Sequence, residues 1–177
     1  MIDYSLAGDA VLRLTRWADD FPEPGVRFAD LTPVFSDASG FRLVVDALSA
    51  CAPDADVIAA VDARGFLLGG GVAREIGSGV VAVRKAGKLP PPVLAESYTL
   101  EYGSATLEIP ADSLGLTGRS VLIVDDVLAT GGTLEATARL VESAGAVVVG
   151  VAVVMEIAAL GGRGRLAKYP LTSLVSV

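Results

Sequence analysis

The sequence predicts a doubly wound, mostly parallel α/β sheet in a single domain of 177 residues. Four short apolar runs have the length and composition of strands that are buried on both faces: VIAAV (57–61), VVAVR (80–84), VLIVD (121–125) and VVVGVAVV (147–154). A helix-length segment separates the first run from the second, and another separates the third from the fourth. Strand–helix–strand repetition of this kind is typical of parallel strands joined by right-handed crossovers.

The expected helices each have an apolar face that would pack on such a sheet. LRLTRWADDF (12–21) and SGFRLVVDALSACA (39–52) are predicted as amphipathic helices near the N-terminus. RGFLLGGGVAREIG (64–77) would be the crossover after the first run, and GGTLEATARLVESAG (131–145) the crossover after the third. Gly145 is suited to end the latter helix, because glycine accepts the left-handed conformation that is common there.

One long segment, KAGKLPPPVLAESYTLEYGSATLEI (85–109), interrupts this alternation. It contains three consecutive prolines, followed by two stretches in which apolar and polar residues alternate. The pattern predicts an excursion that ends in an antiparallel hairpin turning at Gly103. Long excursions in compact domains are usually lids or binding loops, so we expect a lid here.

Composition excludes several classes of function. A net charge of −7 argues against a general nucleic-acid or anionic-membrane surface. The absence of histidine excludes a Ser-His-Asp triad and a cysteine–histidine zinc site. The single cysteine, Cys51, allows no internal disulfide and fits a reducing compartment. The N-terminal residues do not form a signal peptide, and the longest apolar stretch (144–155) is too short to span a bilayer, so a cytoplasmic protein is expected.

The third run ends in two acids and leads into small residues, in VLIVDDVLATGGT (121–133). Ligands of open α/β sheets bind at the carboxyl ends of the strands, where Asp125 and Asp126 are expected. The turn into the next helix has backbone N–H groups and hydroxyls suited to a phosphate, supplied by Ala129, Thr130, Gly131, Gly132 and Thr133. The acids suit sugar hydroxyls or a magnesium ion on the same ligand. A solvated strand end with a plain turn is the structural alternative.

Basic residues follow the first two strands. Arg64, in DARGF (62–66), would lie at a strand end beside a helix start and suits a second anion. The segment VRKAGKLP (83–90) adds three bases after the second strand: Arg84, Lys85 and Lys88. Alone, such residues would be a solvated surface, but beside a predicted phosphate site in an acidic chain they indicate a polyanionic ligand.

Five motifs occur in a characteristic order: DFPEPGVRFADLTPVF, DARGFLLG, VRKAGKLP, ESYTLEYG and VDDVLATGGTLEAT. Together they resemble the adenine phosphoribosyltransferases, a branch of the type I phosphoribosyltransferases, from about Asp20 to the C-terminus. The resemblance implies one domain over residues 1–177, with a hood (about 21–35 and 155–177) and a flexible hairpin lid (about 85–109). It also implies transfer of phosphoribosyl from 5-phosphoribosyl 1-diphosphate to adenine, which gives AMP and diphosphate.

The same resemblance assigns the donor site. Asp125 and Asp126 would bind the ribose hydroxyls, and the 129–133 loop would bind the 5-phosphate. Arg64 would face the diphosphate and take part in catalysis, assisted by Arg84, Lys85 and Lys88. Mg²⁺ would be the cofactor, held mainly by substrate oxygens with no direct protein ligand expected. The family also implies a homodimer.

The lid and the purine site are implied in the same way. Glu101 matches the catalytic lid glutamate, which would manage the proton of the purine, and Tyr102 would help to close the lid. Phe28 and Ile157 would sandwich the purine, and backbone groups around Arg27 would bind its edge.

One hood position departs from the family pattern. Relatives generally carry a basic residue where this chain has Ala29, and Arg27, which would share a face with Ala29 on an extended strand, is the expected substitute. This change keeps a 6-oxo purine (xanthine, hypoxanthine or guanine) open as an alternative substrate. A non-catalytic sensor of phosphoribosyl diphosphate is a further alternative, although this chain lacks the additional DNA-binding domain or basic RNA-binding face that such a regulator would carry.

Overall fold

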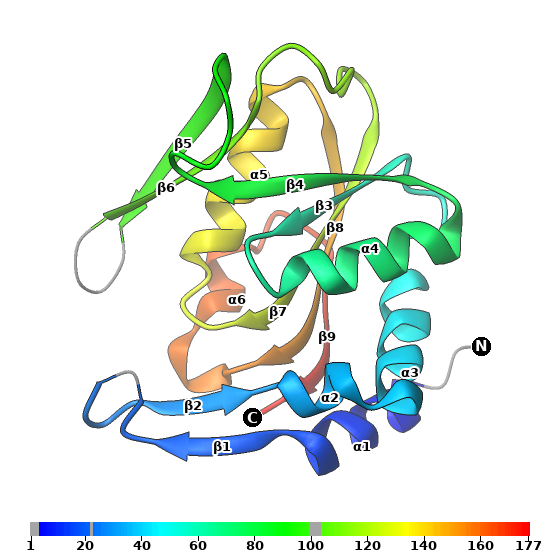
Figure 1. Cartoon of the computed structure of the whole chain (residues 1–177), viewed down its shortest axis with the longest axis vertical. Helices are drawn as coiled ribbons and strands as arrows, with labels where there is room; N and C mark the ends of the chain where they lie inside the picture. Colours follow the sequence, from blue (N-terminus) through cyan, green and yellow to red (C-terminus); the bar gives the residue numbers. More distant parts are fainter. Residues whose placement is uncertain (1–3, 22, 100–103) are drawn as a thin grey trace.

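The computed structural model describes residues 4–21, 23–99 and 104–177, and its centre is a seven-stranded sheet in the order β5-β6-β4-β3-β7-β8-β9 (Figure 1). Neighbouring strands from β4 to β9 are parallel. These five strands are β4 (Gly79–Lys85), β3 (Val57–Val61), β7 (Ser120–Leu128), β8 (Val147–Glu156) and β9 (Leu171–Ser176). The predicted doubly wound, mostly parallel sheet is confirmed, and the four apolar runs lie in β3, β4, β7 and β8.

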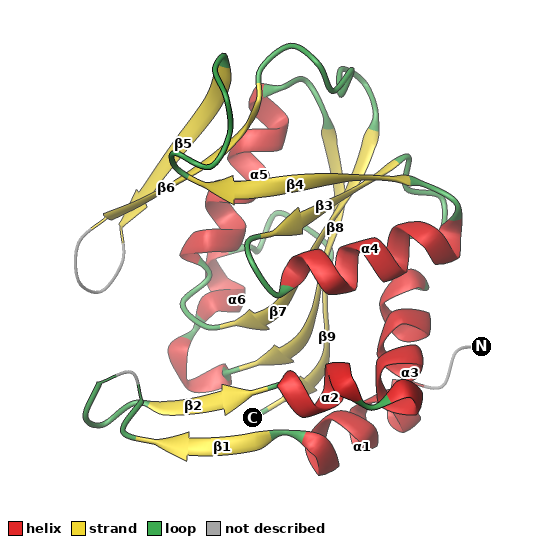
Figure 2. Cartoon of the chain, in the orientation of Figure 1, coloured by secondary structure: helices red, strands yellow, loops and turns green. Residues whose placement is uncertain are grey.

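Helices cover both faces of this sheet (Figure 2). On one face lies α5 (Gly132–Ser143), and on the other lie α1 (Tyr4–Leu14), α3 (Ala38–Ser49) and α4 (Gly65–Ile76). Successive residues of a strand point to opposite faces, so Ala59 joins the core under α5 while Ile58 joins the core under α4. Both faces are covered along β3 and β7, and these strands read as continuous apolar runs. In β4, Val80 and Ala82 are exposed, so the prediction that this run is buried on both faces is wrong. The predicted crossover helices α4 and α5 are confirmed.

The helix predicted over 12–21 is wrong. α1 ends at Leu14, and residues Arg16–Asp19 form β1, which pairs antiparallel with β2 (Arg27–Asp30) in a separate two-stranded sheet. All four residues of β1 are exposed, so backbone pairing with β2, and not burial of a helical face, fixes their conformation. A short helix, α2 (Thr32–Ser36), connects β2 to α3. The helix predicted over 39–52 is confirmed as α3.

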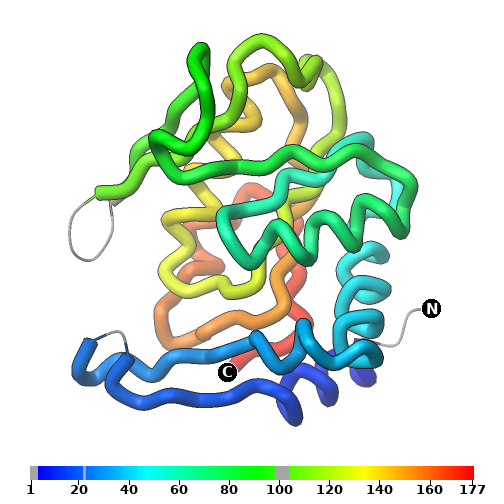
Figure 3. The backbone as a smooth tube through the Cα atoms, in the orientation of Figure 1, coloured from blue at the N-terminus to red at the C-terminus, as the bar shows by residue number. Residues whose placement is uncertain are grey.

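The predicted lid contains an antiparallel pair of strands, β5 (Val93–Thr99) and β6 (Ser104–Pro110). The antiparallel pairing is confirmed, while the turn expected at Gly103 lies outside the described residues. β6 also pairs antiparallel with the end of β4, so the hairpin extends the main sheet. Figure 3 traces the backbone of this part of the chain between β4 and β7.

The C-terminal segment 155–177, assigned to the hood from the sequence, begins at the end of β8. It continues through a 3₁₀ turn (Ala158–Leu160) and α6 (Gly162–Arg165), and then returns to the main sheet as its edge strand β9. In the described part of the chain, no helix is both long and apolar enough to cross a membrane.

Candidate active site

A cavity of about 540 Å³ lies past the carboxyl end of β3, and residues of β7 and of the hairpin also line it. Five parts of the fold contribute to its lining. The lining residues are Asp62, Ala63 and Arg64 after β3, Lys85 of β4, Tyr98, Ala105 and Leu107 of the hairpin, Asp125 and Asp126 of β7, and Thr133 of α5. The fold therefore brings five of the eleven predicted donor-site residues together around this cavity: Arg64, Lys85, Asp125, Asp126 and Thr133.

The two acids lie inside β7, not at its end as the sequence suggested. β7 pairs with β8 as far as Leu128, whereas its pairing with β3 stops at Val124. Because β7 extends beyond β3 on that side, Asp125 and Asp126 occupy the first positions past the shorter strand. They border the cavity while still being held by a regular strand.

Both carboxyl groups are buried, with Asp125 only 9% and Asp126 only 6% exposed. Burial raises the pKa of the Asp125 carboxyl well above its usual range, and repulsion from Asp126 adds to the shift. Burial also raises the pKa of Asp126, against the opposing effect of the Arg64 guanidinium. Two acids in such surroundings destabilise the ligand-free protein, which favours a role in binding or catalysis.

Arg64 joins two of the predicted subsites. Its Nε lies 2.6 Å from Asp126 Oδ2, and its Cζ lies 5.3 Å from the centre of the Phe28 ring. Despite this ion pair, Asp126 Oδ2 accepts no hydrogen bond from the residues that the structure describes. The ion pair with Arg64 offsets part of the cost of burying this carboxylate, and a ligand hydroxyl or a cation would supply a further partner for the oxygen.

Residues 129–133 form the turn into α5, as predicted. Gly131 is the N-cap of the helix, in the left-handed conformation at φ +83°, and a Cβ added to it would lie 2.7 Å from the carbonyl oxygen of Gly162. A small cavity of about 70 Å³ is bounded by Asp125 and residues 127–134. The turn thus presents a helix N-terminus beside the two acids, an arrangement that suits an anion.

The predicted diphosphate residues are placed differently from one another. Arg64 and Lys85 line the larger cavity. Arg84 lies beside it, where its Nε donates to Asp62 Oδ2 at 3.2 Å. Lys88 is exposed and does not line the cavity. Glu101 and Tyr102, the predicted lid residues, lie outside the described residues.

The predicted purine-binding side chains come from the two ends of the chain. Phe28 is half-buried on β2, and its ring meets that of Phe21 edge-on with centroids 5.1 Å apart. Ile157 is half-buried directly after β8, and its N–H donates to the carbonyl of Leu128 at 2.9 Å. This bond ties Ile157 to the residue that precedes the 129–133 loop.

The Arg27 side chain lies on the β1–β2 sheet. Its guanidinium carbon is 4.4 Å from the centre of the Trp17 ring, and its Nε is 3.6 Å from Asp19. Ala29 is buried, so the two positions differ in their surroundings although both are on β2. The guanidinium beside Phe28 therefore belongs to Arg64.

Comparison with known proteins agrees with this geometry. Residues 42–174 match the family model described as "Phosphoribosyl transferase domain". The chain is 86% identical over 177 residues, the whole of both proteins, to the adenine phosphoribosyltransferase of Rhodococcus jostii. The chain belongs to the adenine phosphoribosyltransferase family.

Solved adenine phosphoribosyltransferases have the same fold. The enzyme from Thermoanaerobacter pseudethanolicus matches with a TM-score of 0.91 and 43% identity, covering 96% of this chain and 99% of that chain. The enzyme from Saccharomyces cerevisiae, complexed with adenine and an imino-altritol bisphosphate, matches with a TM-score of 0.90 and 35% identity, covering 97% of this chain and 99% of that chain.

In this adenine phosphoribosyltransferase fold, an ion pair between the buried Glu156 and the half-exposed Arg163 precedes Ile157 and was not predicted. Glu156, 6% exposed, accepts hydrogen bonds from Arg163 Nε at 3.0 Å and from Ser173 Oγ at 3.0 Å. The hydrogen bonds from Arg163 lower the pKa of Glu156. Arg163 lies in GGRGR, where nothing in the local sequence distinguishes it from a solvated base.

Gly162 was also missed. It begins α6, and a Cβ added to it would contact the carbonyl oxygen of Ala129 and lie 2.9 Å from the backbone nitrogen of Gly131. α6 therefore packs directly against the backbone of the 129–133 loop. The sequence contains no sign of this contact, because the two segments are about thirty residues apart.

Arg163→Met is expected to lower the free energy of unfolding at neutral pH by about 1–2 kcal/mol, a value reduced because the Arg163 side chain is half exposed. The pKa of Glu156 is lowered in the folded state, so its stabilisation is present above the unfolded pKa and is lost as the pH falls through the folded pKa. Urea denaturation at neutral and acidic pH should show the deficit shrinking in acid. Lys168→Met, which breaks the exposed pair with Glu142, should have little effect at either pH.

Proposed function

We propose that this chain transfers the phosphoribosyl group from 5-phosphoribosyl 1-diphosphate to adenine, producing AMP and diphosphate. The observation that carries the proposal is the buried pair Asp125 and Asp126, which lies beside the small-residue turn at the start of α5. Asp126 Oδ2 is paired with Arg64 but accepts no hydrogen bond from the residues that the structure describes. High identity over the full length of the Rhodococcus jostii adenine phosphoribosyltransferase supports the same function.

At the sugar end, Asp125 and Asp126 accept hydrogen bonds from the ribose hydroxyls, and the 129–133 loop binds the 5-phosphate. Asp126 Oδ2 accepts no hydrogen bond from the described residues, and a ribose hydroxyl would donate one to it, which supports this role. On donor binding, Arg64 exchanges its contact with Asp126 for the diphosphate. Lys85 lies in the same cavity and assists, together with Arg84 and Lys88 nearby in the sequence.

Mg²⁺ is proposed as the cofactor. In the described residues, histidine, cysteine and acidic side chains nowhere gather in a group of three or more that would hold a metal. Carboxylate and phosphate oxygens are the ligands that Mg²⁺ prefers, so donor oxygens would hold it, with Asp126 Oδ2 beside them. When bound, Mg²⁺ neutralises negative charge on the diphosphate.

The reaction breaks the bond between C1 of the ribose and the diphosphate oxygen, and the bond electrons leave with the diphosphate. A new bond forms between C1 and N9 of adenine, which loses its N9 proton. By resemblance to the family, we propose that Glu101 takes up that proton and that Tyr102 helps to close the lid. Because the transition state resembles an oxocarbenium ion, positioning and electrostatics supply most of the catalysis.

Phe28 and Ile157 hold the two faces of the purine, and backbone groups around Arg27 bind its edge. Such a site rejects a 6-oxo purine, which has a carbonyl acceptor and an N1–H donor where adenine has an amino donor and an N1 acceptor. These groups would leave buried polar atoms unpaired. Relatives generally carry a basic residue at the hood position that is Ala29 in this chain. Here the guanidinium of Arg64, beside Phe28, provides a positive charge close to the hood.

We further propose a cytoplasmic homodimer. Leu67 on α4 and Val80 on β4 are 56% and 51% exposed, large values for apolar side chains on two elements that contact each other. A second copy would cover them. The single cysteine and the absence of a disulfide pair fit a reducing compartment.

The test is a panel of bases. The purified protein, phosphoribosyl diphosphate and magnesium are mixed separately with adenine, hypoxanthine, guanine and xanthine, and nucleotides are separated by chromatography. AMP formed from adenine alone is the expected result. Turnover of a 6-oxo purine in its place would overturn the assigned base. Donor binding without any turnover would instead favour a sensor of phosphoribosyl diphosphate.

A further inference from the structure

Tyr98 connects the lid to the phosphate loop. It lies on β5, half-buried, and its hydroxyl accepts a hydrogen bond from Thr133 Oγ1 at 3.1 Å. Thr133 is the second residue of α5 and belongs to the proposed phosphate loop. Both side chains line the cavity that also contains Asp125 and Asp126. One hydrogen bond therefore joins the lid strand to a residue assigned to the donor phosphate.

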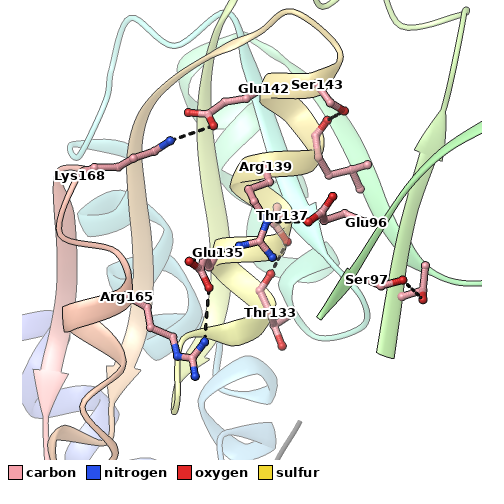
Figure 4. Close-up of polar contacts among 12 residues, drawn as sticks. Glu96, Ser97, Thr133, Glu135, Thr137, Arg139, Glu142, Ser143, Arg165 and Lys168 are labelled. Atoms are coloured by element: carbon pink, nitrogen blue, oxygen red, sulfur yellow. Dashed lines mark hydrogen bonds and ion pairs between the residues drawn. The ribbon is translucent and has the colours of Figure 1, made fainter. Parts of the chain in front are cut away.

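A second contact holds the same face of β5 on α5. Arg139 Nε donates to Glu96 Oε1 at 2.6 Å, and Figure 4 shows Arg139 and Thr133 on α5 with Glu96 opposite. Glu96 and Tyr98 are two residues apart on a strand, so their side chains leave the same face. Ser97 leaves the other face and bonds Thr106 within the hairpin at 2.8 Å. Of these two contacts between β5 and α5, Tyr98 reaches Thr133 at the start of α5, whereas Glu96 reaches Arg139, six residues further along the helix. The Tyr98 contact is therefore the one beside the phosphate loop.

The hydroxyl of Thr133 has one proton and two acceptor lone pairs. Without ligand, this proton is donated to Tyr98. A bound phosphate needs the same proton, because a phosphate oxygen is an acceptor. Once Thr133 donates to the phosphate, its lone pairs are free to accept the O–H of Tyr98. The direction of the bond then reverses, and the chain from Tyr98 through Thr133 to an anion is charge-assisted and stronger.

We propose that Tyr98 is a positioning residue for the transfer reaction, which tightens the contact between β5 and α5 when a phosphate occupies the 129–133 loop. It acts through Thr133 and does not bind the substrate itself. Because β5 leads into Glu101 within three residues, the same bond places the strand that precedes the proposed catalytic residue. The inference rests on the proposed function, which assigns the phosphate to this loop.

Tyr98→Phe removes the hydroxyl and keeps the ring. We expect kcat with adenine to fall about tenfold, with the KM for phosphoribosyl diphosphate within about twofold of wild type, because Thr133 remains free to bind the phosphate. Ser97→Ala is the matched control, since it removes a hydroxyl from the neighbouring position on the opposite face of the same strand. It should leave both constants near wild type. A raised KM with unchanged kcat in Tyr98→Phe would mean direct substrate binding and would overturn the proposal.

A second measurement does not depend on turnover. Hydrogen exchange of residues 93–99 is followed with and without ribose 5-phosphate, which carries the phosphate but no diphosphate. We expect the phosphate to slow exchange in wild type and in Ser97→Ala, but not in Tyr98→Phe. An equal response in all three proteins, or none in wild type, would overturn the link. A wild-type response without nucleotide formation from any purine would contradict the proposed function and leave the link standing.

Discussion

Gly162→Ala is expected to lower the free energy of unfolding by about 2–3 kcal/mol and to reduce kcat/KM for the donor by about 100-fold. The added Cβ would contact the carbonyl oxygen of Ala129, and it would lie 2.9 Å from the nitrogen of Gly131 and 2.8 Å from Cδ1 of Leu128. The first two are backbone atoms of the phosphate loop, so they cannot give way as a side chain would. The loop must therefore move, and with it the N–H groups proposed to bind the phosphate.

Gly164→Ala is the matched control for this prediction. Gly164 lies two residues further along α6, and a Cβ added there would meet no atom of the described residues within 4 Å. This variant should keep wild-type stability and activity to within about 0.5 kcal/mol. Urea denaturation and titration calorimetry with the donor would compare the two variants. Equal behaviour of the two would show that α6 does not pack tightly on the loop.

The centre of the sheet was predictable because β3 and β7 are covered on both faces. Such strands need apolar residues at every position, so VIAAV and VLIVD stand out without knowledge of their partners. The turn into α5, residues 129–131, was predictable for a local reason as well. Its conformation depends on small residues within a few positions, such as Gly131 at φ +83°.

The features that were missed depend on contacts between distant segments. Residues 16–19 have the spacing of a helix, but they pair with residues 27–30, which no periodicity reveals. The two acids lie inside β7 because β8 pairs with it as far as Leu128, and they border the cavity because pairing with β3 stops at Val124. The relative lengths of neighbouring strands are not encoded in any one of them. Gly162 and Arg163 gain their roles from the 129–133 loop and from Glu156, respectively.

Asp125→Asn is expected to reduce kcat/KM by about 100-fold and, at neutral or higher pH, to stabilise the ligand-free protein by about 1–2 kcal/mol. Activity falls because a carboxylate proposed to bind the ribose becomes a weaker, neutral acceptor. Stability rises because one of two buried, neighbouring charges is removed. Asparagine keeps the shape of the side chain, and its Oδ1 can still accept the N–H of Asp126, now at 2.9 Å from Asp125 Oδ1.

The sign of the pH dependence follows from the raised pKa of Asp125. The folded protein binds this proton more tightly than the unfolded chain does, so the group costs nothing below the unfolded pKa. The cost appears as the pH rises from the unfolded pKa through the folded pKa, and wild-type stability falls over that window. Asp125→Asn removes this titration, so its advantage over wild type should grow with pH in urea denaturation experiments.

Asp56→Asn is the control with the opposite sign. Asp56 precedes β3 at the other end of the sheet, and its Oδ2 accepts hydrogen bonds from the backbone N–H and the Oγ of Ser120, each at 2.8 Å. These bonds lower the pKa of Asp56, so its contribution is lost as the pH falls. This variant should keep its activity, and any stability that it loses should be lost mainly at neutral pH. If Asp125→Asn lost activity without gaining stability at high pH, the buried pair would not be strained in the free protein, and the cost that we assign to the ligand-free site would be wrong.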